Sequence, residues 1–191
     1  CGKKSGVITL TYANFPPAAT FPCVQMEQWK TAVEKATGGK VKINTFPDST
    51  LLDAKNMMDG VIAGQADIGC LSMAYQPGRF MVTNALALPL GIRDAETGSI
   101  ILNEIFSKYK PSEFANVKVL VLFANSPANV MSKKPVRVLA DLKNMPLRAS
   151  GGASEMLKAL GATPVGMPMS ETPEAIQKGV VSGLFSSHEV L

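Results

Sequence analysis

One arginine in this sequence has neighbours that could make it an anion-binding residue. Arg148 ends a short run, Met145–Arg148, that predicts a strand, and a Gly-Gly turn, Gly151-Gly152, follows it. The small residues of Ser150–Ser154 open a predicted helix, Glu155–Leu160, and leave several of its first backbone N–H groups open. A guanidinium offers a flat fork of donors and a helix N-terminus adds partial positive charge, so this stretch suits a carboxylate. The simpler alternative is an arginine in a surface salt bridge.

Few residues could carry nucleophilic, metal or phosphate chemistry. His188, the only histidine, lacks the partner pattern of a general base. The three cysteines, Cys1, Cys23 and Cys70, form no CxxC pair, so a Cys/His metal site is not expected. The Gly151-Gly152 turn lacks the lysine of a phosphate-binding loop. The sequence therefore predicts no catalytic residue, no cofactor and no metal.

The composition is that of a globular chain. Of the 191 residues, 46% are hydrophobic and 18% are charged, which separates this sequence from disordered ones. No uninterrupted apolar run reaches the roughly 18 residues of a membrane span. The net charge of +4 is modest and no basic run alternates with aromatic residues, so nucleic-acid binding is not expected.

The first residues resemble the start of a mature bacterial lipoprotein. The run CGKKS begins on Cys1 without an initiating methionine, as after removal of a signal peptide. Cys1 would then carry the lipid, residues 1–6 would form a tether, and this anchor would be the only contact with a membrane. A cloning or proteolysis scar is the alternative. Cys23 and Cys70 either pair in an oxidising compartment or remain free buried thiols.

Strand-like and helix-like segments alternate along residues 7–124. Val117–Phe123 is fully apolar, which predicts a central strand buried on both faces. The other predicted elements are the strands Val7–Ala13, Val41–Phe46 and Ala66–Leu71 and the helices Phe21–Thr37, Asp53–Ala63 and Glu96–Tyr109. The core face expected for the first helix comprises Val24, Trp29, Ala32 and Val33. This alternation predicts a mostly parallel sheet with helices on both sides, which forms a first α/β lobe.

A second α/β unit is predicted to begin at about residue 125. Its elements are the strands Asn129–Ser132, Met145–Arg148, Pro164–Met167 and Val180–Phe185 and the helices Glu155–Leu160 and Glu171–Lys178. A sheet that stopped there would expose both an edge and a face. The sequence therefore predicts a second lobe over residues 125–191 whose C-terminal part is missing.

Five stretches in this order and spacing resemble the solute-binding proteins of TRAP (tripartite ATP-independent periplasmic) transporters, the DctP-type family. They are Gly38–Pro47, Asp59–Gly69, Ala85–Leu90, Ser132–Arg148 and Gly161–Gly183, so the resemblance spans nearly the whole chain. It implies a two-lobed periplasmic-binding-protein-like α/β fold with mostly parallel sheets and a ligand cleft between the lobes. It also implies a longer complete protein, in agreement with an incomplete second lobe.

The resemblance implies which residues bind the ligand. Arg148 matches the arginine that pairs with the ligand carboxylate in this family. Ala128 falls where many members that bind polar acids have a second arginine, which disfavours a dicarboxylate. The predicted ligand-binding residues are Arg148, Ser72, Met73, Tyr75, Asn14, Met169, Phe185 and Ser186. Their methionine and aromatic side chains, together with Met131, favour an apolar or aromatic monocarboxylate, unless the methionines only fill gaps in the core.

The predicted function is therefore that of an extracytoplasmic solute-binding protein rather than an enzyme. It would capture a small organic acid in the periplasm and deliver it to the membrane subunits of a TRAP transporter. The first alternative is the ligand-sensing domain of an envelope signalling receptor, which a membrane span further along the chain would favour. The second is an envelope enzyme, which turnover assays on a panel of carboxylates would identify.

Overall fold

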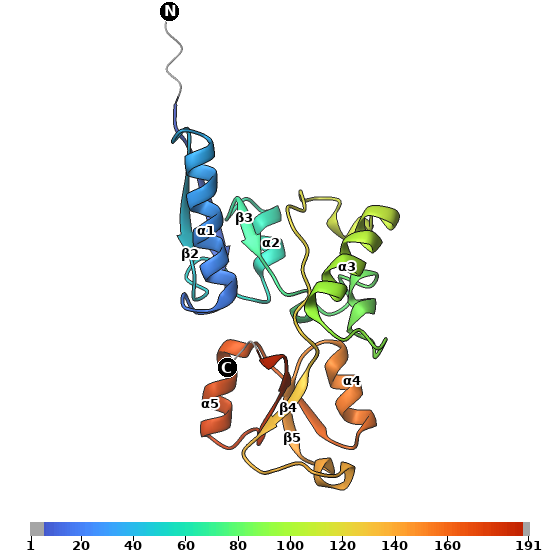
Figure 1. Cartoon of the computed structure of the whole chain (residues 1–191). Helices are drawn as coiled ribbons and strands as arrows, with labels where there is room; N and C mark the ends of the chain where they lie inside the picture. Colours follow the sequence, from blue (N-terminus) through green and yellow to red (C-terminus); the bar gives the residue numbers. More distant parts are fainter. Residues whose placement is uncertain (1–5, 189–191) are drawn as a thin grey trace, which may run out of the picture. The chain divides into compact units, whose positions relative to one another are not determined.

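The computed structural model of the protein describes residues 6–188 (Figure 1). The chain divides into two units. The first unit ends at Ser72 and the second begins at Met73. The predicted lobe boundary between residues 124 and 125 lies inside the second unit, and it stays a prediction. The predicted lipid site at Cys1 lies outside the described residues.

A parallel three-stranded sheet in the order β2-β1-β3 organises the first unit. Its elements are β1 (Ile8–Asn14), α1 (Phe21–Ala36), β2 (Val41–Phe46), α2 (Met57–Ile62) and β3 (Ile68–Cys70). Each of them overlaps a predicted element of the same type, so this part of the prediction is confirmed. Gly38 and Gly39 both adopt positive φ after α1, a conformation open to glycine, and so they end the helix before β2.

A small buried cluster joins α2 to the sheet of the first unit. Ala13, Met57 and Ala66 are almost fully buried in this cluster. A Cβ atom on Gly69 would lie 3.0 Å from the sulfur of Met57. A side chain at position 69 would therefore force Met57 and Val61 of α2 to shift.

The predicted core face of α1 is only partly correct. Cys23 and Met26 are the buried residues of the helix, Val33 is half-buried, and Trp29 packs edge-on against Tyr12 of β1, whereas Val24 is 42% exposed. Ala32 is also exposed. Residues three apart share one face of a helix. Because Cys23 and Met26 lie on the buried face, Val24 points away from the sheet.

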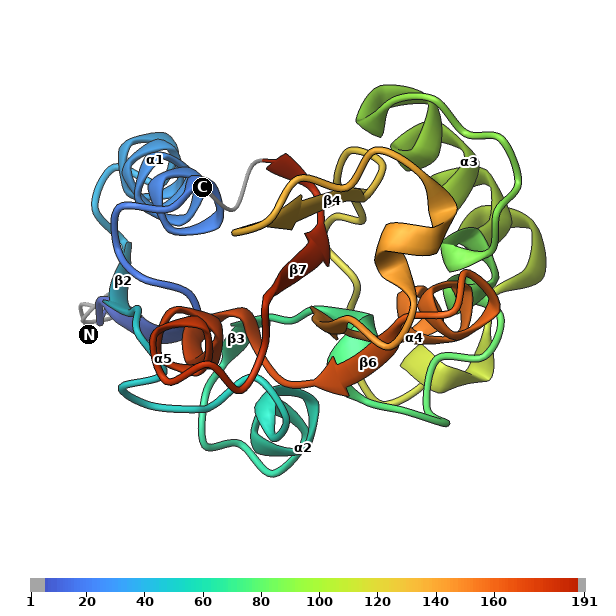
Figure 2. The same cartoon turned by 90° about the horizontal axis from the view of Figure 1, so that it is seen from below.

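A four-stranded sheet organises the C-terminal part of the second unit. Its strand order is β4-β7-β5-β6, with β4 and β7 antiparallel and the other two pairs parallel. Figures 1 and 2 show α4 and α5 on opposite sides of this sheet. The elements of the unit are η1 (Met73–Tyr75), η2 (Thr83–Ala87), α3 (Ala95–Tyr109), η3 (Ser112–Phe114), β4 (Asn129–Ser132), η4 (Leu139–Leu142), β5 (Pro146–Ala149), α4 (Gly152–Ala159), β6 (Thr163–Gly166), η5 (Met169–Glu171), α5 (Thr172–Gln177) and β7 (Gly183–Ser186). The prediction of mostly parallel sheets with flanking helices is confirmed.

The prediction of a central buried strand at Val117–Phe123 is wrong. Among residues 6–188, no strand pairs with this segment, and Val121 is 71% exposed. Side chains of α3 instead bind its backbone: the Asn103 amide donates to the Leu122 carbonyl at 2.9 Å. The Ala124 N–H donates to the Ser99 hydroxyl at 2.9 Å. An apolar run predicts an extended segment correctly, but strand pairing also needs a neighbouring strand, which the run itself does not specify.

A buried apolar cluster packs around β5 in the second unit. Leu147, Ala149 and Leu157 are fully buried there, and Leu142 and Ala162 complete the cluster. These residues pack β5 against α4, and Arg148, which lies between Leu147 and Ala149, is therefore held on a rigid strand. Within residues 6–188, no helix has both the length and the apolar character that crossing a membrane would need.

Candidate functional site

Arg148 lies on the central part of the second sheet and is buried. It pairs with Val165 of β6 on one side and with Leu184 of β7 on the other. Only 2% of its surface is exposed, so it is a charged residue at a core position. The alternative of a surface salt bridge is therefore wrong.

Two neutral oxygens bind the Arg148 guanidinium. Its Nε donates to the Met167 carbonyl at 3.0 Å, and its Nη2 donates to the Tyr75 hydroxyl at 2.9 Å. The Tyr75 hydroxyl also accepts a hydrogen bond from the backbone N–H of Met169 at 3.2 Å. The guanidinium carbon lies 5.9 Å from the centre of the Tyr75 ring, within the range of a cation–π contact.

The Arg148 charge has no counter-ion in the part of the chain that the structure describes. The ion pairs found over residues 6–188 join other lysines and glutamates, most of them exposed. A buried cation without a paired anion is costly, because the apolar surroundings replace its hydration. Two of the five guanidinium N–H groups bind protein oxygens, and the others remain for an anion. The arrangement suits a carboxylate.

The glycine turn after Arg148 packs closely against two short helices. Gly151 has φ +56°, and a Cβ atom on it would lie 3.0 Å from the Cβ of Ala74 in η1. A Cβ atom on Gly152 would lie 3.1 Å from the Cβ of Ala87 in η2. The two glycines therefore fix η1 and η2 against the turn between β5 and α4.

The other predicted ligand residues of the second unit fall into two groups. Tyr75 accepts a hydrogen bond from Arg148, and the backbone N–H of Met169 donates to the same Tyr75 hydroxyl. Phe185 is half-buried and packs against the cluster beneath β5, as a core residue does. Met73 and Ser186 are half-buried. Ligand contact by any of these residues stays a prediction.

Asn14 and Ser72, also predicted to bind ligand, belong to the first unit. Asn14 ends β1, is fully buried, and accepts the Phe15 N–H at 3.0 Å through its side-chain oxygen. Its side-chain nitrogen has no hydrogen-bond partner within the described residues. Ser72 is half-buried just after β3. A ligand role for both stays a prediction.

Sequence reasoning missed one group that binds the arginine and one buried polar side chain of the same unit. The Met167 carbonyl is a backbone acceptor, which no residue type reveals. Gln76 is 6% exposed, and its Nε2 has no partner among the described residues, whereas its Oε1 accepts from Arg79 at 2.9 Å. In the sequence, the only indication of a role for Gln76 is its position directly after Tyr75.

The two described cysteines are free thiols. Burial, and then the neighbouring Cys23, raise the pKa of Cys70 to about 11. Burial also raises the pKa of Cys23, whose sulfur donates to the Pro16 carbonyl at 3.2 Å. Both groups are protonated at neutral pH, and a thiol is neither a nucleophile nor a metal ligand. No metal-binding group of His, Cys, Asp and Glu side chains occurs over residues 6–188.

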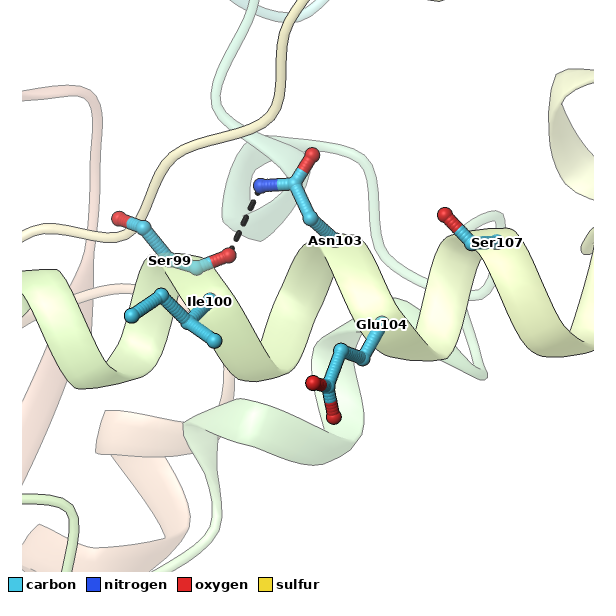
Figure 3. A pocket seen from close by; sticks show the side chains of 5 residues that line it. All are labelled: Ser99, Ile100, Asn103, Glu104 and Ser107. Carbon is cyan, nitrogen blue, oxygen red and sulfur yellow. Dashed lines mark hydrogen bonds between the residues drawn. The ribbon is translucent and has the colours of Figure 1, made fainter.

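A shallow hollow of about 400 Å³ lies on the exposed face of α3 (Figure 3). It is lined by Ser99, Ile100, Asn103, Glu104 and Ser107, all from this helix. None of the predicted ligand residues lines it, and its one charged side chain is a carboxylate. Such a surface would repel an organic anion, so Arg148 remains the candidate site.

A buried arginine on an interior strand of a mostly parallel sheet, with no counter-ion among residues 6–188, is suited to bind a small anion. The family described as "Bacterial extracellular solute-binding protein, family 7" (DctP) matches residues 13–191. The chain belongs to this family, which confirms the resemblance to TRAP solute-binding proteins. The family consists of binding proteins and not enzymes, so the predicted class of protein is confirmed.

Among curated relatives, the chain is similar to the 2,3-diketo-L-gulonate-binding periplasmic protein YiaO of Escherichia coli K12. The two are 30% identical over 153 residues, which cover 78% of this chain and 47% of the relative. The C4-dicarboxylate-binding periplasmic protein DctP of Vibrio cholerae is 26% identical over 161 residues, 79% of this chain and 47% of the relative. These relatives are periplasmic, in agreement with the predicted localisation.

Many solved structures are similar to the chain, among them the following two. A TRAP periplasmic solute-binding protein from Desulfovibrio salexigens is 59% identical with a TM-score of 0.81, over 97% of this chain and 58% of the other. Its structure is an open complex with the C-terminus of a symmetry mate in the ligand-binding site. A protein from an unidentified marine microbe, specific for aromatic acids and bound to 3-hydroxybenzoate, is 30% identical with a TM-score of 0.92, over 97% and 59%.

The chain spans about half the length of these curated relatives and less than two thirds of these solved structures. Relative to those structures, the two-lobed fold is therefore only partly represented in this chain, in line with the predicted incomplete lobe. The lipid anchor at Cys1 stays a prediction.

Proposed function

We propose that the protein binds a small organic acid through Arg148 and delivers it to the membrane subunits of a TRAP transporter. The observation that carries this proposal is the buried guanidinium, which has no carboxylate partner within residues 6–188. An incoming carboxylate would supply the missing counter-charge through charge-assisted hydrogen bonds.

The ligand of this proposal is an apolar or aromatic monocarboxylate. Ala128 stands where a second arginine would be needed, so a second carboxylate would be desolvated without a partner. Met73 and Met169 are half-buried and suited to contact an apolar body. Two relatives support the class: one binds 3-hydroxybenzoate, and another holds a polypeptide C-terminus, which ends in a carboxylate, in its ligand site.

Native mass spectrometry of the isolated protein tests the proposal directly. We expect a bound small acid with one carboxyl group, released when the protein is denatured. The same preparation of Arg148→Ala should carry none, while Arg137→Ala, which removes an exposed arginine of the same unit, should retain it. A bound dicarboxylate or sugar acid would overturn the ligand class, and a bound molecule without an acid group would overturn the function.

A further inference from the structure

One phenol oxygen connects three segments of the second unit. The Tyr75 hydroxyl accepts from Arg148 Nη2 at 2.9 Å and from the Met169 N–H at 3.2 Å. Tyr75 ends η1, Arg148 lies in β5, and Met169 begins η5. These segments are far apart in the sequence, so the oxygen joins them only in the folded chain.

We propose that Tyr75 is a positioning residue that sets the direction of the Arg148 guanidinium, and not part of the wall around the ligand's apolar body. This inference rests on the proposed function, in which Arg148 binds the carboxylate. A guanidinium is a rigid plane, so bonds to two of its nitrogens fix its orientation. Here the Met167 carbonyl holds Nε and the Tyr75 hydroxyl holds Nη2.

The remaining donors then face the ligand in a fixed arrangement. Both N–H groups of Nη1 and one of Nη2 bind no oxygen among residues 6–188. A planar carboxylate can bind the two terminal nitrogens through parallel hydrogen bonds. Because Tyr75 and Met167 already hold the side chain, the ligand does not have to immobilise it, and the entropic cost of binding falls.

Tyr75 is itself held in place by the turn that follows Arg148. Its neighbour in η1, Ala74, lies so close to Gly151 that a Cβ atom there would be 3.0 Å from the Ala74 Cβ. The Met169 N–H supplies a second restraint on the phenol oxygen. The hydroxyl therefore has a defined position before any ligand binds, which a positioning residue requires.

Tyr75→Phe is the test, because it removes the hydroxyl and keeps the ring. With 3-hydroxybenzoate as the probe, calorimetry should give an affinity about five- to tenfold weaker than that of the parent protein, since about one hydrogen bond is lost. Tyr109→Phe removes a hydroxyl from an exposed tyrosine at the end of α3 and should bind as the parent does. Tyr75→Phe should have no further effect in an Arg148→Lys background, because the group that Tyr75 orients is then absent.

Nitrogen NMR of the arginine side chains gives a readout that needs no ligand. In the parent protein, Arg148 Nη1 and Nη2 should give separate signals, because two bonds hinder rotation of the guanidinium. In Tyr75→Phe the two signals should broaden or merge. A parent protein with averaged Arg148 signals would overturn the inference even if the variant failed to fold.

The outcomes separate this inference from the proposed function. If Arg148→Ala binds acids as the parent does, the proposed function fails. If Arg148→Ala loses binding but Tyr75→Phe matches the parent in affinity and NMR signals, only the positioning role fails. An equal loss for Tyr75→Phe in the parent and Arg148→Lys backgrounds would mean that Tyr75 supports the fold and does not act through Arg148.

Discussion

Arg148 combines a core position with a charge that two neutral oxygens only partly stabilise. The Met167 carbonyl and the Tyr75 phenol lower the cost of burial through hydrogen bonds and leave the net charge in place. A protein carboxylate at the same place would neutralise the charge and remove its attraction for a ligand. The choice of neutral acceptors is therefore what suits this arginine to bind an anion.

Arg148→Ala should weaken binding of 3-hydroxybenzoate by roughly thirtyfold or more. Removing one partner of a desolvated charge pair costs about 2–5 kcal/mol, and about 1.4 kcal/mol is a factor of ten. Arg148→Lys should not restore affinity, because an ammonium cannot form two parallel bonds to a carboxylate. Calorimetry measures both, with Arg137→Ala as the control. An unchanged affinity in Arg148→Ala would remove the residue from the site.

Asp67 should make the first unit sensitive to acid. The Thr11 backbone N–H at 2.7 Å and then its hydroxyl at 2.9 Å hold the pKa of the Asp67 carboxyl below its usual value. A lowered pKa in the folded state gives stability that is present above the unfolded pKa. This stability is lost as the pH falls through the folded pKa.

Asp67→Asn should therefore reduce the difference in denaturant midpoint between about pH 7 and about pH 3. Trp29 fluorescence follows the first unit. Glu104→Gln, a change at an exposed carboxylate on α3, should leave the difference as in the parent. An equal pH dependence in Asp67→Asn and the parent would show that the Thr11–Asp67 bonds contribute nothing to stability.

At the scale of elements, the sequence predicted what local patterns determine. Alternation, glycine stops and short β-rich runs were sufficient for β1, β2, α1, α3 and the strands around Arg148. The errors arose where a partner decides the outcome. Val117–Phe123 has the pattern of a buried strand, but α3 side chains bind its backbone and leave Val121 exposed. The buried face of α1 likewise depends on its angle on the sheet, which its weakly patterned sequence does not determine.

The pairing of β4 with β7 should depend on the absence of a side chain at position 183. A Cβ atom on Gly183 would clash with the Met131 carbonyl and lie 2.7 Å from the Ser132 Cα, both backbone groups that cannot swing aside. Gly183→Ala should cost about 3 kcal/mol, the upper end for overpacking. Far-UV circular dichroism in denaturant measures the cost. Gly166→Ala in β6, where a Cβ atom meets nothing within 4 Å, is the control and should be nearly neutral.

At the scale of the whole molecule, sequence reasoning identified the family but not the local geometry around Arg148. Residue order was enough to recognise the DctP pattern, and the family match over residues 13–191 confirms it. That Arg148 is buried follows from its position on a central strand, which depends on the strand order of the sheet. The role of Tyr75 depends on a contact between residues 73 positions apart, which a single sequence does not reveal.

The ranking of ligands tests how the whole chain responds to one anion site. A ligand that binds only the folded state stabilises it by about 2.7 kcal/mol at a hundred times its Kd. At about 2–4 °C per kcal/mol for a chain of this size, the thermal midpoint should rise by about 5–11 °C.

Benzoate and 3-hydroxybenzoate should produce such a shift. Succinate and malate should not, because the proposed site has one arginine, and their second carboxylate would be desolvated without a partner. Arg148→Ala should abolish the shift with benzoate, since the anion site is gone. If malate or a sugar acid raised the midpoint more than benzoate did, other polar groups would have to serve the second acid group, and the proposed ligand class would be wrong.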